Sequence, residues 1–160
     1  MLPGGFRVIG FADPIYRGLS AMLDLQEDDL RGRETKETPI DWLGASPRQL
    51  LQTIGTDWGR DLIRPDLWVE LCRRRLFRLH DSGVRRVAIA DLRFANEVEM
   101  VREFGGEVWL VDRPGAETTP HAHRSEDGLP ADAIDRTIVN DCGLDELRRR
   151  VEAAFRPAHP

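Results

Sequence analysis

Short apolar runs alternate with helical patterns along this chain, and this alternation limits the possible folds more than any other feature. Strand-like runs cover residues 6–11, 84–90, 108–111 and 138–139, and stretches between them space their apolar side chains like helices. Strands that alternate with helices usually pair in parallel, because the helix supplies the long crossover connection. We therefore predict an α/β domain with a mainly parallel sheet.

Capping and stop signals outline the predicted helices. Asp13 and Pro14 fit the N-cap and first position of a helix that runs to about Leu25. Ser46 fits the cap of another helix, which Gly55 stops. Further helices are expected after residues 65–66, at about 96–104 and at about 144–155, whereas residues 26–40 are polar and indicate an exposed excursion.

Length and composition exclude several classes of protein. The 160 residues predict one domain spanning residues 1–160. No apolar run approaches the roughly 18 residues of a membrane span, and the first residues lack the pattern of a signal peptide. A formal net charge of -5 argues against a dedicated nucleic-acid binder. We expect a cytoplasmic protein that binds neither membrane nor nucleic acid.

Polar clusters follow three of the predicted strands. Asp13 follows the first, the segment 91–97 follows the second, and Asp112 with Arg113 follows the third. The carboxyl ends of parallel strands face a common crevice, so this mixture of carboxylates and guanidiniums suits a phosphorylated, hydroxyl-bearing ligand. Spacing alone equally allows a structural interpretation, in which Asp91 pairs with Arg93 while Asp13 and Asn96 cap helices.

Five blocks in register carry a family resemblance. They are Ser46–Asp57, Asp66–Trp68, Asp91–Glu97, His123–Pro130, and Asn140–Asp141 with Leu144–Leu147. With these blocks the chain resembles the phage-type deoxynucleoside monophosphate kinases across nearly its whole length. The resemblance implies a three-layer P-loop kinase fold and transfer of the γ-phosphoryl group of Mg-ATP to a deoxynucleoside monophosphate (dNMP). It also implies a homodimer, no tightly bound cofactor, and Mg²⁺ that arrives with ATP.

The resemblance also implies roles for individual residues. An acceptor-binding helical region covers about residues 26–82, and a lid covers about 112–130. The implied substrate-binding residues are Arg48, Gly55, Thr56, Trp68, Asp91, Arg93 and Glu97; Asp91, Arg93 and Arg113 are the implied catalytic residues, and Arg113 and Arg124 belong to the lid. Trp68 also lies on an apolar helix stripe, which favours a place in the core. His121 and His123 alone do not predict a metal site, and no metal-binding residue is expected.

The sequence lacks the P-loop motif Gly-x-x-x-x-Gly-Lys-Ser/Thr, whose backbone amides and lysine hold donor phosphates. Lys36, the only lysine, has no glycine turn before it, and Tyr16 stands where the family commonly has lysine. We expect an N-terminally truncated or late-started chain, less stable than a complete relative or oligomeric. The alternatives are a non-catalytic nucleotide-binding module and an inactive prophage remnant.

Overall fold

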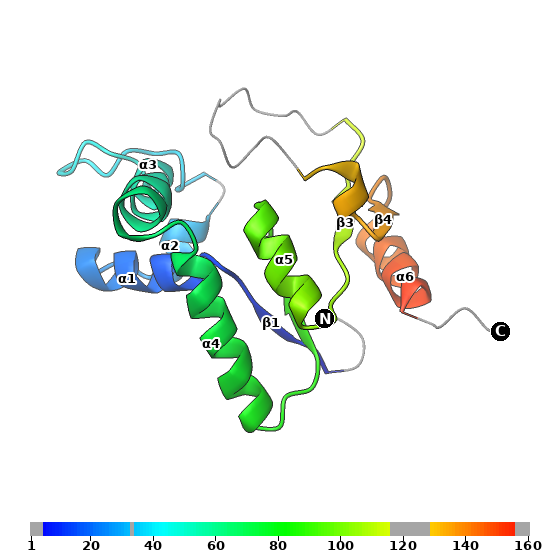
Figure 1. The fold of residues 1–160 in the computed structure, drawn as a ribbon. Coiled ribbons are helices and arrows are strands. Elements are labelled where there is room, and N and C mark those ends of the chain that lie inside the picture. The colour runs from blue at the N-terminus through cyan, green and yellow to red at the C-terminus, as the bar shows by residue number, and fades with distance from the viewer. Residues whose placement is uncertain (1–4, 33, 116–128, 156–160) are drawn as a thin grey trace. The chain divides into compact units, whose positions relative to one another are not determined.

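The computed structural model describes residues 5–32, 34–115 and 129–155 (Figure 1). The chain divides into two compact units. One unit is Arg7–Asp91, and the other combines Met1–Phe6 with Leu92–Pro160. In the described ranges, no helix is long and apolar enough to cross a membrane.

The unit Arg7–Asp91 contains a short parallel sheet and a group of helices. Strand β1 (Arg7–Ile9) pairs in parallel with β2 (Val87–Ile89), with Val8 opposite Ala88. The helical elements are α1 (Asp13–Leu23), α2 (Glu27–Arg31), α3 (Pro47–Gln52), the π-helical segment η1 (Thr53–Ile63) and α4 (Leu67–Asp81). Contacts join α1 to α2 and α3, and η1 to α3 and α4. Both predicted strands are confirmed in shorter form.

The starts of two helices test the capping predictions. The Ser46 hydroxyl accepts a hydrogen bond from the Gln49 amide at 3.3 Å, and the Gln49 side chain accepts one from the Ser46 amide at 2.8 Å. This capping box confirms the predicted start of α3. The predicted cap of α1 is wrong by one residue, because Ala12 is the N-cap and Asp13 the first helical residue. The Asp13 carboxylate instead accepts the Gly10 amide at 2.9 Å.

The expectation of an exposed excursion over residues 26–40 is wrong for its first part. Residues Glu27–Arg31 form α2, and the Leu30 side chain is fully buried, with 0% exposure. The Gln26 amide donates to the Asp29 carboxylate at 3.3 Å, which stabilises the start of the helix. One apolar residue among charged neighbours is too short a pattern to reveal a helix, and the helix forms here because Leu30 packs into the interior of the unit.

The expectation that Gly55 stops a helix is also wrong. The chain continues without a break from α3 into η1, and the Arg64 amide donates to the Gly59 carbonyl, five residues back, at 3.1 Å. The physical reason is Trp68, which is 5% exposed and donates its indole N–H to the Gly55 carbonyl at 2.7 Å. The wide helical turn directs this carbonyl to the indole instead of ending the helix.

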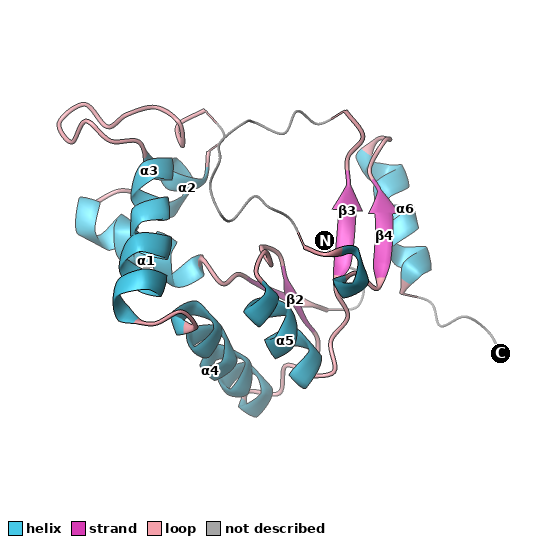
Figure 2. Ribbon diagram, turned by 45° about the horizontal axis from the view of Figure 1, so that its top comes forward, coloured by secondary structure: helices cyan, strands magenta, loops and turns pink. Residues whose placement is uncertain are grey.

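The second unit contains the other parallel pair. Strand β3 (Trp109–Asp112) pairs with β4 (Arg136–Val139), and Figure 2 shows α6 (Leu144–Ala154) beside this sheet. Helix α5 (Ala95–Glu103) and a short 3-10 turn, η3 (Ala131–Ala133), complete the described elements. The Phe155 ring packs against Trp109, with centroids 4.6 Å apart. Strand and helix predictions for this unit are confirmed within a few residues.

Together the two pairs confirm a mixed helix and strand protein with short parallel sheets. Burial and polar bonding explain why the second pair forms. Val108 and Ile138 are buried, and the Asp135 carboxylate accepts both the Val108 amide and the Arg102 guanidinium, each at 2.6 Å. Asp135 therefore holds the chain before β3 beside the chain before β4, and it ties both to the end of α5.

Candidate functional site

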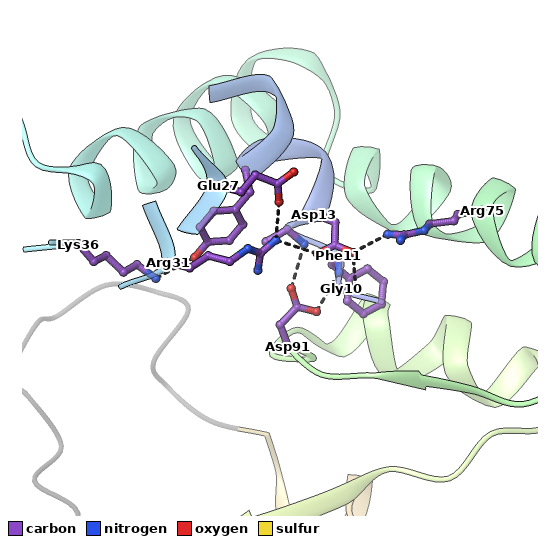
Figure 3. Close-up of polar contacts among 10 residues, drawn as sticks. Gly10, Phe11, Asp13, Glu27, Arg31, Lys36, Arg75 and Asp91 are labelled. Carbon is purple, nitrogen blue, oxygen red and sulfur yellow. Dashed lines mark hydrogen bonds and ion pairs between the residues drawn. The ribbon is translucent and has the colours of Figure 1, made fainter. Parts of the chain in front are cut away.

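Strand β2 delivers Asp91 to its carboxyl end, as predicted, and the carboxylate binds the backbone at the start of α1. Its two oxygens accept the Phe11 amide at 2.8 Å and the Ala12 amide at 2.9 Å (Figure 3). A Cβ atom on Gly10 would lie 2.7 Å from Asp91 Oδ2, so only glycine leaves room for this approach. Asp91 therefore joins the end of β2 to the start of α1.

Asp13 lies at the centre of a second set of contacts, which we call the Asp13 cluster: Asp13, Arg31 and Arg75. Arg75 donates to one oxygen of the Asp13 carboxylate, and Arg31 donates to the other at 3.1 Å. Burial raises the pKa of Asp13, but hydrogen bonds from Arg75, the Gly10 amide and Arg31 outweigh it and hold the pKa below its ordinary value of 3.8. The carboxylate stays ionised and links α1 to α2 and α4.

We expect the substitution Asp13→Asn to destabilise the chain by about 2 kcal/mol near pH 7, because charge-assisted hydrogen bonds to two guanidiniums are lost. The Asp13 side chain is only 19% exposed, which limits screening by water. Because the folded pKa is lowered, this contribution is complete above pH 3.8 and disappears as the pH falls through the folded value. Urea unfolding of the wild type and of Asp13→Asn at several pH values measures this contribution. A difference in the free energy of unfolding that stays constant down to about pH 2 would contradict the lowered pKa of Asp13.

Tyr16 and Lys36 form a polar pair beside the Asp13 cluster. Lys36 Nζ donates to the Tyr16 hydroxyl at 2.9 Å, and the Arg31 guanidinium lies 3.9 Å from the centre of the Tyr16 ring. Sequence reasoning assigned no role to this pair. Only the composition could have drawn attention to Lys36, which is the single lysine in a chain with 23 lysine and arginine residues.

The predicted acceptor-pocket residues on α3, η1 and α4 lie close along the chain. The Arg48 guanidinium binds the Glu37 carboxylate, and the Arg48 amide donates to the Lys36 carbonyl at 2.9 Å. Gly55 and Trp68 meet through the indole hydrogen bond, and Thr56 is half-buried beside Gly55. Trp68 therefore lies in the core, in agreement with its apolar stripe. Its role toward a nucleotide stays a prediction.

The other predicted site residues belong to the second unit. Glu97 is 2% exposed, and its carboxylate accepts the amides of Arg93 and Phe94 at 2.7 and 3.1 Å, which caps the start of α5. The Arg93 side chain is exposed, as is Arg113 after β3. Arg124, His121, His123 and most of the predicted lid fall in 116–128, outside the described residues. The convergence of all these groups in one crevice stays a prediction.

Within the described ranges, no three His, Cys, Asp or Glu side chains gather to hold a metal ion. Charged groups instead gather around the carboxyl end of a parallel strand pair, the edge of a sheet at which α/β proteins usually bind their ligands. A match to the family model described as deoxynucleotide monophosphate kinase covers residues 35–151. The chain belongs to this family.

Curated relatives support this membership. A protein of Acanthamoeba polyphaga mimivirus is 34% identical over 92% of this chain and 81% of its own length. The deoxynucleoside-5'-monophosphate kinase of Escherichia phage T5 is 34% identical over 74% of this chain, and a deoxynucleotide monophosphate kinase of Escherichia phage RB69 is 34% identical over 69%. The matches cover 49% and 45% of these two phage proteins, so the chain spans about half the length of the phage relatives it matches.

Proposed function

We propose that this chain binds a dNMP and takes part in the transfer of the ATP γ-phosphoryl group to it, which yields a deoxynucleoside diphosphate. The observation that carries the proposal is the family match over residues 35–151. That range includes the block 46–57 and the strand end at Asp91, so it covers the groups assigned to the acceptor nucleotide. The proposed architecture is the three-layer P-loop kinase fold, which the short parallel strand pairs support.

The proposed catalytic residues are Asp91, Arg93 and Arg113. Phosphoryl transfer needs positioning and charge stabilisation more than covalent chemistry, and arginine binds phosphate through a planar set of donors. The two amides that hold Asp91 fix its carboxylate in one orientation at the strand end, which supports a positioning role. The exposure of Arg93 and Arg113 leaves each side chain accessible to a ligand.

The acceptor pocket is proposed to involve Arg48, Gly55, Thr56, Trp68 and Glu97. Arg48 would hold the phosphate, and binding there would compete with Glu37 for the guanidinium. Trp68 would support the pocket indirectly. Its buried indole donates a hydrogen bond to the Gly55 carbonyl and so helps to fix the shape of η1. Glu97 acts through the start of α5, where its carboxylate holds the Arg93 amide.

Magnesium is proposed to arrive with ATP, whose phosphates it would neutralise during transfer. Among the residues that the structure describes, no three His, Cys, Asp or Glu side chains lie close enough together to hold a metal ion. The proposed reaction assigns the metal to the donor nucleotide.

A non-catalytic nucleotide-binding module is the second candidate, and one observation favours it. The 160 residues contain no Gly-x-x-x-x-Gly-Lys-Ser/Thr motif, whose backbone amides usually hold the donor phosphates. Such a module would bind dNMP without turnover of ATP. The two candidates share the acceptor site and differ only in whether phosphoryl transfer follows binding.

Two measurements on the full chain separate these functions. We expect saturable binding of at least one of dAMP, dCMP, dGMP and dTMP in a titration, and ADP release from Mg-ATP that depends on that nucleotide. Binding without ADP release would replace the kinase by the binding module. Absence of both, with a folded protein, would contradict the proposed function and favour an inactive remnant.

A further inference from the structure

Lys36 differs from the nearby cations in the partner that it contacts. Both guanidiniums of the Asp13 cluster contact a carboxylate, and Arg48 contacts that of Glu37. Lys36 Nζ instead donates to the neutral hydroxyl of Tyr16 at 2.9 Å. No ion pair within the described part of the chain includes Lys36. Its positive charge is therefore held in place without being neutralised by a contacting carboxylate.

The pair of Lys36 and Tyr16 has donors to spare for an anion. A lysine ammonium carries three N–H donors, and one of them is used on the Tyr16 oxygen, which leaves the phenolic O–H able to donate as well. The Arg31 guanidinium, 3.9 Å from the ring centre, holds the phenol from its face. The two unused N–H donors of Lys36, the Tyr16 O–H and the positive charge of the ammonium are groups that suit the oxygens of a phosphate.

Backbone contacts tie this pair to the predicted acceptor region. The Arg48 amide donates to the Lys36 carbonyl at 2.9 Å, and the Lys36 amide donates to the Gly32 carbonyl at 2.9 Å. Two backbone hydrogen bonds therefore anchor Lys36, one of them from the first turn of α3, and its side chain reaches Tyr16 on α1. Its side chain is half-buried, so part of it remains accessible to a ligand.

We propose that Lys36 and Tyr16 together bind the phosphate of the acceptor dNMP and so select nucleotides over nucleosides. This inference rests on the proposed function. Lys36 supplies the positive charge and its remaining N–H donors, whereas Tyr16 orients the ammonium and adds its own O–H. The pair thus supplies a phosphate contact without the exchange of partners that binding by Arg48 requires.

Titrations followed by NMR test the pair, with a dNMP and the matching deoxynucleoside as probes. In the Lys36→Gln variant we expect the Kd for the monophosphate to rise at least tenfold and the Kd for the nucleoside to stay within about twofold. Tyr16→Phe should raise the monophosphate Kd about threefold, because it removes a neutral donor and frees the ammonium. Lys36→Arg keeps the charge and should retain more affinity than Lys36→Gln.

The matched control is Arg74→Gln, which removes one positive charge from an exposed position on α4 and should leave both Kd values unchanged. An unchanged monophosphate Kd in Lys36→Gln would overturn the inference and leave the proposed function standing. An equal rise of the Kd for the monophosphate and for the nucleoside would also overturn the inference, since it would mean that Lys36 supports the local structure and does not contact the phosphate. Wild-type protein that is folded and binds no dNMP would instead contradict the proposed function, and the inference with it.

Discussion

Replacing Gly59 with alanine is expected to lower the free energy of unfolding by about 3 kcal/mol, at the upper end of the cost of overpacking a core. A Cβ atom at this position would lie 2.4 Å from Trp68 Cζ2 and 2.9 Å from the carbonyl oxygen of Ile54. Neither neighbour can move cheaply, because Trp68 is buried and bonded to Gly55 and the Ile54 oxygen belongs to the backbone of η1. The π-helical segment must distort or release the indole.

Gly18→Ala provides the matched control for this substitution. Gly18 lies inside α1, and a Cβ there would meet no atom within 4 Å. Alanine at this helix position should raise the free energy of unfolding by about 0.5–1 kcal/mol, because it reduces the freedom of the unfolded chain. Urea unfolding followed by circular dichroism measures both variants. Equal stability of Gly59→Ala and wild type would contradict the packing described for Trp68.

The substitution Asp91→Ala should destabilise the chain by about 3 kcal/mol. It removes the two hydrogen bonds that the carboxylate accepts, at 2.8 and 2.9 Å, and leaves the amides of Phe11 and Ala12 without that partner in a partly buried place. Because Asp91 connects the end of β2 to the start of α1, its loss should also loosen the β1–β2 pair.

Asp41→Ala is the control for that variant, because Asp41 is an exposed acid in the same unit and its removal should change stability by less than about 0.5 kcal/mol. Urea unfolding of the full chain compares the two. If Asp91→Ala weakens dNMP binding and leaves stability at the wild-type value, the carboxylate acts only on ligand and its structural role is wrong.

The sequence predicts element order well where a pattern is local and repeated. Apolar runs and stop signals locate both parallel pairs, and the Ser46 capping box locates the start of α3 because its partners are three residues apart. The short helix α2 escapes prediction, since one buried residue, Leu30, provides its apolar face. The π-helical segment also escapes, because it depends on Trp68, which approaches from a different helix.

The candidate site depends on contacts that no sequence spacing reveals. Asp91 is predictable as a strand-end carboxylate, yet its partner amides lie about 80 residues earlier in the chain. The spacing of residues left open whether Asp13 caps a helix or contacts a ligand. In the structure the Asp13 carboxylate accepts hydrogen bonds from two guanidiniums on other helices. The pairing of Lys36 with Tyr16 joins two residues that neither share a motif nor follow a helical period. Tertiary packing decides these pairs.

A titration of the wild-type chain with the four dNMPs, followed by amide NMR signals, tests the central claim most directly. We predict saturable binding of at least one monophosphate at one site per chain, with the amide signals of Tyr16, Lys36 and Arg48 among those that shift most. Folded protein whose signals do not respond to any of the four would contradict it. Saturable binding that leaves those three amides unmoved would contradict the site assigned to the phosphate.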